Sequence, residues 1–118
     1  MATEAESRYL KGKKGEKISE NFLIQSGYLI IEKNYRKISG EIDIIAVKGE
    51  TIFFIEVKFW KSGKFSPLET FSAPKIKKMQ STAERFLSNN VSFGTHFVSF
   101  ALIAVSENEE VEFYSNLF

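Results

Sequence analysis

Hydrophobic and polar residues follow two different periods along the chain. Residues 3–26 show a helical pattern, and in residues 74–89 the apolar positions recur every three or four residues. Runs rich in aromatic and β-branched residues predict five strands, at 28–35, 41–48, 51–59, 96–105 and 111–114. The order α-β-β-β-α-β-β predicts an α/β (α+β) fold, with a mixed sheet packed against helices.

Local signals mark where several of these elements begin and end. Thr3 and Glu6 match a capping box at the start of the first helix, and Gly27 suits its C-terminal end. Gly12 and Gly15 weaken the first half of that helix. Between the second and third strands, Gly49-Glu50 suits a two-residue type II′ hairpin turn. Residues 61–67 are expected to form a loop.

The turn fixes which residues of the hairpin face each other. If Gly49 and Glu50 form the loop, Lys48 faces Thr51. The same register brings together two pairs of charged residues at the far end, Asp43 with Glu56 and Glu41 with Lys58. Alternation places these four on one face of the sheet, whereas the other face is apolar. That apolar face is predicted to consist of Ile42, Ile44, Ala46, Phe53, Ile55 and Val57.

This charged corner suits a divalent cation. Directly opposed, Asp43 and Glu56 would have Cβ atoms roughly 5 Å apart and repel by about 3 kcal/mol at an effective dielectric constant near 20. Lys58 offsets only part of that repulsion, whereas Mg²⁺ takes one or two carboxylates together with waters and substrate phosphate. The lysine could then orient an attacking water. The alternative is structural: Glu41 and Lys58 form a cross-strand ion pair, and Asp43 and Glu56 are solvated.

Composition narrows the chemistry further. A chain of 118 residues, 43% hydrophobic and 26% charged, predicts a single domain over residues 1–118. With no cysteine and one histidine, thiol nucleophiles, thiolate zinc sites and multi-histidine metal centres are excluded. No segment predicts a membrane span or a secretory signal, so a cytoplasmic location is expected.

Charge is unevenly distributed. Residues 1–85 carry all 16 basic and 11 of the 15 acidic residues, and residues 86–118 carry only the remaining acids. Such an asymmetry gives weak support for phosphate binding on one face.

The charged residues also carry a resemblance. Gly40-Glu41-Ile42-Asp43, followed across the hairpin by Ile55-Glu56-Val57-Lys58, resembles the metal-binding signature of the PD-(D/E)XK nucleases, the restriction-endonuclease-like superfamily. From about Gly12 to Val105 the chain resembles the YraN-like group of endonuclease-like proteins. The resemblance implies an αβββαβ core with a mixed central sheet flanked by helices. It further implies Asp43 and Glu56 as ligands of Mg²⁺ or Mn²⁺, Lys58 as the catalytic lysine, and Glu41 and Glu16 as additional acidic residues of the site.

Basic residues near this motif are candidates for DNA contacts. Arg36 precedes the GEID segment within the match. Members of the group often carry arginine where this chain has Trp60, and Lys61 and Lys64 are nearby substitutes. Lys75 and Lys78 lie on one side of the second helix, where they could contact phosphates. Such a row of lysines is more often simply a solvated helix face.

The sequence therefore favours a Mg²⁺- or Mn²⁺-dependent nuclease that hydrolyses phosphodiester bonds in DNA, including branched DNA as in Holliday-junction resolvases. The alternative is a nucleic-acid-binding module of the same fold that does not cleave and acts through a partner. A third hypothesis is a structural interaction domain that binds neither metal nor nucleic acid. By analogy with resolvases, a homodimer is expected.

Overall fold

The computed structural model describes residues 3–61 and 66–118. Its elements occur in the predicted order, with short 3₁₀ turns, η1 and η2, before and after the second helix. Their bounds are α1 Glu4–Gln25, β1 Leu29–Lys37, β2 Gly40–Lys48, β3 Thr51–Phe59, η1 Pro67–Thr70, α2 Ala73–Asn89, η2 Val91–Phe93, β4 Phe97–Val105 and β5 Val111–Tyr114. The sequence predicted neither 3₁₀ turn, because single turns have no hydrophobic period.

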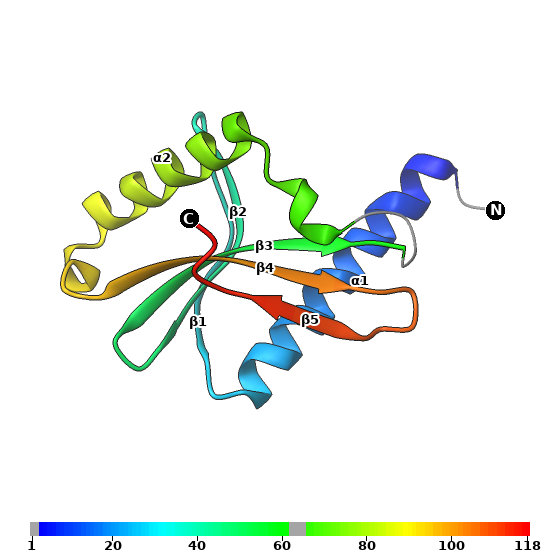
Figure 1. The fold of residues 1–118 in the computed structure, drawn as a ribbon, viewed down its shortest axis with the longest axis horizontal. Helices are drawn as coiled ribbons and strands as arrows, with labels where there is room; N and C mark the ends of the chain where they lie inside the picture. The colour runs from blue at the N-terminus through cyan, green and yellow to red at the C-terminus, as the bar shows by residue number, and fades with distance from the viewer. Residues whose placement is uncertain (1–2, 62–65) are drawn as a thin grey trace.

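The strands form one mixed sheet in the order β1-β2-β3-β4-β5. All neighbours are antiparallel except β3 and β4, which run parallel and are joined by the crossover through α2. The helices cover opposite faces of this sheet (Figure 1). One buried cluster, under α2, includes Phe54, Met79 and Phe86, and the other, under α1, includes Leu23 and Ile103. The mixed α+β fold predicted from the sequence is thus confirmed.

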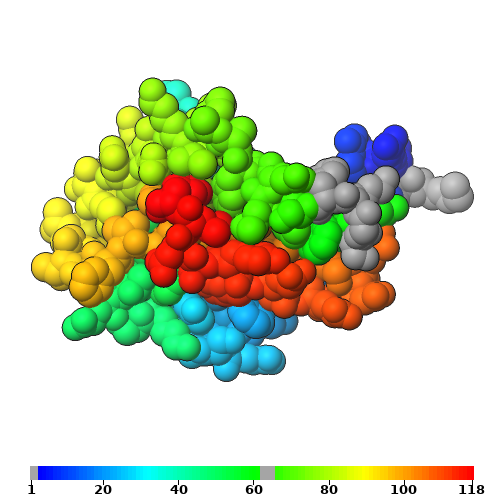
Figure 2. Space-filling view, viewed as in Figure 1, coloured from blue at the N-terminus to red at the C-terminus, as the bar shows by residue number. Residues whose placement is uncertain are grey.

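Helix α1 begins and ends as predicted. The Glu6 backbone N–H donates to the Thr3 hydroxyl over 3.0 Å, and the Thr3 N–H donates back to the Glu6 carboxylate over 3.4 Å. Gly27 follows the helix with a φ of +88°. At its N-terminal end α1 extends past the sheet, and Figure 2 shows this blue segment standing out from the body of the molecule. Neither helix is long and apolar enough, in the described residues, to cross a bilayer.

The hairpin of β2 and β3 has the predicted register. Lys48 pairs with Thr51, and the pairing continues to Ile44 and Ile55. Gly49 has a φ of +60° while Glu50 keeps a negative φ, as a type II′ turn requires. The recorded pairing ends at Ile44 and Ile55, one step before Asp43 and Glu56.

The predicted faces do not hold at Ile42 or at its neighbours Glu41 and Asp43. These two acids line cavities toward both helices, so the four charged residues do not share one face as predicted. Ile44, Ala46 and Ile55 pack under α1, but Ile42 belongs to the cluster under α2 together with Ile45. At Ile42 the strand is paired only with β1, opposite Tyr35 in the same cluster under α2, because the recorded pairing with β3 ends at Ile44.

Candidate active site

The carboxylate of Asp43 lies where β2 and β3 separate. Its Oδ2 accepts the backbone N–H of Val57 over 2.7 Å. A side chain thus replaces the strand-to-strand hydrogen bond that would come next in the ladder. This contact fixes the position of the Asp43 carboxylate between the two strands.

The environment of Asp43 is strongly unfavourable for its negative charge. Burial, followed by the charge of Glu56, raises the pKa of Asp43 from its ordinary value of 3.8 to about 7. The hydrogen bond from Val57 opposes this rise, while Glu16 and Glu41 add to it. Carboxylates from α1, β2 and β3 therefore act on one another, so the site favours a proton or a cation at Asp43.

Two basic residues pair with acids of this group. Lys75 of α2 lies 3.1 Å from a carboxylate oxygen of Glu56, whose side chain is only 17% exposed. Arg36 of β1 lies 3.0 Å from a carboxylate oxygen of Glu41. The predicted alternative of a Glu41–Lys58 ion pair is therefore wrong. Arg36 is the cross-strand neighbour of Glu41 in the β1–β2 ladder, whereas the β2–β3 pairing ends before Glu41.

Two cavities meet at these carboxylates. The first has a volume of about 390 Å³ and lies between β2, β3 and the start of α2. It is lined by Gly40, Glu41, Asp43, Glu56, Ser72, Pro74, Lys75, Lys78 and Met79. The second, of about 490 Å³, lies between α1, β1 and β2. It is lined by Arg8, Tyr9, Gly12, Lys13, Glu16, Asn34, Arg36, Glu41 and Asp43. Glu41 and Asp43 line both cavities and so form the wall that the two share.

A close contact fixes the β1–β2 hairpin against α2. The hydroxyl oxygens of Ser39 and Thr82 lie 2.9 Å apart in a hydrogen bond. Gly40 has a φ of +148°, and a Cβ atom there would lie 3.1 Å from the Thr82 hydroxyl oxygen and 3.5 Å from Lys78 Cβ. Glycine is therefore required at this position. The contact fixes the strand that carries Glu41 and Asp43 relative to the helix that carries Lys75 and Lys78.

Lys58 shares a face of β3 with Glu56. The residues on either side of it, Val57 and Phe59, pack in the cluster under α1, so Lys58 projects toward the α2 side. Lys58 is exposed. In the described part of the chain it makes no ion pair and lines neither cavity. Its catalytic role stays a prediction.

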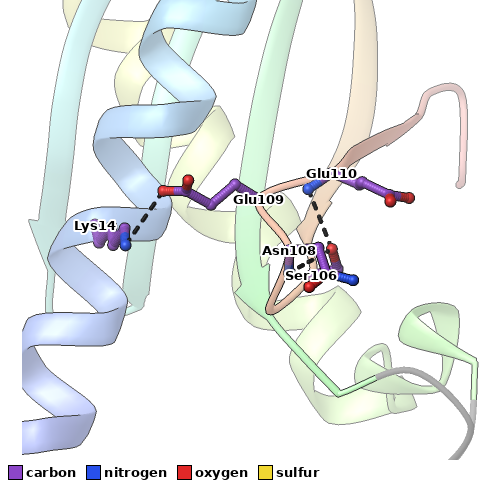
Figure 3. Close-up of polar contacts among 5 residues, drawn as sticks. All are labelled: Lys14, Ser106, Asn108, Glu109 and Glu110. Carbon is purple, nitrogen blue, oxygen red and sulfur yellow. Dashed lines mark hydrogen bonds and ion pairs between the residues drawn. The ribbon is translucent and has the colours of Figure 1, made fainter.

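The other predicted DNA contacts differ in their surroundings. Lys61 lies 3.6 Å from a carboxylate oxygen of Glu107 in the turn between β4 and β5. In the same turn, Glu109 pairs with Lys14 of α1 over 3.2 Å (Figure 3). Lys64 lies outside the described residues. Lys75, Lys78 and Arg36 are thus the predicted basic residues that the structure brings to the cavities.

The carboxylates partly fit a bound Mg²⁺ or Mn²⁺. In residues 3–61 and 66–118 no three or more Asp, Glu or His side chains are grouped closely enough to enclose a metal ion. Mg²⁺, however, is often held by only one or two carboxylates, with waters and substrate phosphate completing its shell. The raised pKa of Asp43 and its neighbour Glu56 match that need for a cation. These two side chains are therefore the candidate ligands.

Five residues of the second cavity were not predicted as site residues from the sequence. Arg8, Tyr9, Gly12 and Lys13 come from the first half of α1, and Asn34 comes from β1. The i, i+4 spacing of Tyr9 and Lys13 could have placed them on one side of the helix, in line with Glu16. Asn34 has a φ of +52°, a conformation that asparagine tolerates better than most residues.

Comparison with known proteins places the chain in a family. Residues 15–105 match Uncharacterised protein family UPF0102. The chain belongs to the UPF0102 family. This is the YraN family, so the predicted YraN-like resemblance is confirmed. The matched segment contains Glu16, Glu41, Asp43, Glu56 and Lys58.

Relatives within UPF0102 match over most of their length. A UPF0102 protein of Leptospira interrogans is 49% identical over 109 residues, covering 92% of this chain and 94% of the relative. One from Clostridium novyi is 38% identical and covers 91% and 93%. Another from Thermotoga maritima is 40% identical and covers 77% and 83%.

Proposed function

We propose that this UPF0102 protein is a Mg²⁺- or Mn²⁺-dependent nuclease that hydrolyses phosphodiester bonds in DNA, branched DNA included. One observation carries the proposal. Asp43 is half-buried and experiences the charge of three other carboxylates, and lysines line the same cavity. Carboxylates favour a metal ion and lysines favour a phosphate group. Hydrolysis of a phosphodiester needs both kinds of group close together.

The residues divide into two groups by the chemistry they offer. Asp43 and Glu56 would hold the metal, which supplies Lewis acidity and lowers the pKa of a bound water. Glu41 and Glu16 would add negative charge around it. Lys75 and Lys78 line the same cavity from α2 and would bind the phosphate group. Lys58 would assist the attacking water.

The test is a cleavage assay with the purified chain. Branched, single-stranded and duplex DNA are each incubated with Mg²⁺ or Mn²⁺. We expect Asp43→Ala and Lys58→Ala to lower the rate by about 100-fold or more, the usual contribution of a group acting in proton transfer or metal binding. Glu50→Ala, in the exposed hairpin turn far from the cavities, serves as the control. Cleavage that persists unchanged in both site variants would rule out this site.

The second candidate is a module that binds nucleic acid without cleaving it. Two observations favour it: no three acidic side chains of the described chain enclose a metal position, and Lys75 already pairs with Glu56. It predicts DNA affinity that falls steeply with salt and no metal-dependent cleavage of any substrate. Calorimetric titration with Mn²⁺ separates the two candidates, because only the nuclease requires binding of the metal at Asp43 and Glu56.

A further inference from the structure

The second cavity has a wall that the proposed cleavage chemistry does not use. Arg8, Tyr9, Gly12 and Lys13 come from neighbouring turns of α1 and lie on one side of it. Across the cavity are Asn34 of β1 and the shared carboxylate Asp43. A ligand in this cavity would therefore touch the reacting centre at one end and the first half of α1 at the other.

Gly12 is not explained by the packing of the protein. A Cβ atom at Gly15 would meet the Phe59 side chain at 3.6 Å, so close packing against β3 accounts for a small residue there. A Cβ atom at Gly12 would meet no atom within 4 Å in the described chain. Glycine within a helix is destabilising relative to alanine. The gap at Gly12 leaves the helix backbone open to a ligand in the cavity.

The side chains around Gly12 suit a nucleotide. Arg8 and Lys13 are exposed cations, and neither has an ion-pair partner in residues 3–61 and 66–118. Tyr9 is 64% exposed, and the Lys13 ammonium lies 5.7 Å from the centre of its ring. Cations bind phosphate, and an exposed aromatic ring next to them can stack on a base.

We infer that this cavity binds the nucleotide next to the scissile phosphate, in an unpaired segment of the DNA strand. Arg8 and Lys13 bind its phosphate, Gly12 lets the sugar-phosphate backbone approach the helix, and the Tyr9 ring stacks on its base. The segment is unpaired because a base within a duplex is already stacked on both sides and cannot lie on Tyr9. This inference rests on the proposed function, because it places the reacting phosphate at Asp43.

The test measures binding separately from cleavage. All variants are made in the full chain carrying Asp43→Asn, so that the DNA stays intact. Fluorescence anisotropy with a labelled single-stranded oligonucleotide then gives the Kd of each. We expect Gly12→Gln, which fills the gap, and Tyr9→Ala to raise the Kd about 5- to 20-fold, the effect of losing one stacked base. Lys13→Ala should raise it about 3-fold or more.

Lys14→Ala is the matched control. It removes the same charge from the opposite side of the helix, where Lys14 pairs with Glu109, and should change the Kd less than about 2-fold. Glutamine favours helix more than glycine does, so Gly12→Gln should keep or raise the melting temperature. Weaker binding with unchanged or higher thermal stability therefore reports on the cavity and not on folding.

Each outcome bears on a different claim. If the Gly12→Gln and Tyr9→Ala variants bind the single-stranded oligonucleotide with the same Kd as the Lys14→Ala variant, the inference is overturned. The cleavage assay would still decide whether the protein is a nuclease. If these substitutions raise the Kd for fully duplex DNA as much as the Kd for single-stranded DNA, the assignment to an unpaired segment is overturned. If the wild-type chain binds no DNA at all, the inference and the proposed function both fail.

Discussion

Asp43 is the residue at which burial and like charge meet in this protein. Its carboxylate has one favourable contact, the Val57 N–H, against three neighbouring carboxylates. The motif and the hairpin register predicted that Asp43 and Glu56 lie near each other, and the charge of Glu56 does act on Asp43. The ion-pair partners Lys75 and Arg36 were not predicted, because lysine and arginine side chains are long and can reach several acids at similar cost.

Asp43 should make the stability of the metal-free protein depend on pH. Because its pKa is raised in the folded state, protonated Asp43 contributes stability that is fully present below pH 3.8 and is lost as the pH rises through about 7. We expect the free energy of unfolding to fall between pH 4 and pH 8 by on the order of 2 kcal/mol from this group, allowing for its partial exposure. The carboxylates that face Asp43 are Glu56, Glu16 and Glu41, from β3, α1 and β2.

Asp43→Asn isolates this effect. The variant should be more stable than the wild type at pH 8 and show a flatter pH profile, measured by urea denaturation in a chelating buffer. Glu84→Gln, exposed on α2, is the control. Identical pH profiles for wild type and Asp43→Asn would contradict the assigned cause.

At the scale of elements, the junction of the β1–β2 hairpin with α2 positions the site. The sequence predicted the turn at Gly49 because a short turn depends on the conformation of one or two residues. It did not predict that Gly40 packs against α2, since that contact joins segments about forty residues apart.

Two glycine substitutions distinguish a turn from a packing contact. Gly40→Ala forces a residue with a Cβ into φ +148° and against Thr82, so we expect a loss of about 2 to 3 kcal/mol in the free energy of unfolding. Gly49→Ala has the unfavourable φ of +60° but meets no described atom within 4 Å, so about 1 kcal/mol is expected. Urea denaturation measures both. Equal losses would show that the contact with Thr82 is unimportant.

At the scale of the whole molecule, the acidic turn between β4 and β5 balances part of the basic charge. Glu107 and Glu109 pair with Lys61 and Lys14. The basic residues of the cavities lie along α1, β1 and α2, away from this turn. The charge asymmetry of the sequence thus becomes, in the fold, an acidic turn that contributes no residue to either cavity.

Removing the negative charge of this turn should strengthen DNA binding through long-range electrostatics. Replacing Glu107 and Glu109 together by glutamine removes two charges that repel DNA and frees Lys61, a predicted DNA contact, so we expect the Kd for DNA to fall about 2- to 5-fold at low salt. Ser106 accepts the N–H groups of Asn108 and Glu110, so the turn should keep its shape (Figure 3). At about 0.3 M salt, counter-ions screen the interaction between these charges and DNA, so the gain in affinity should vanish. Glu50→Gln with Glu84→Gln is the charge-matched control, and an equal gain there would contradict a local effect.

The sequence by itself determined the order of elements, the register of the β2–β3 hairpin and membership of UPF0102. These depend on local periodicity, on turn residues and on a short motif, all of which act over a few residues. Tertiary structure decided where β2 separates from β3, which bases pair with Glu41 and Glu56, and that the first half of α1 forms a wall of the second cavity. Those features arise where segments distant in sequence pack together, and their outcome depends on the whole core rather than on any one segment.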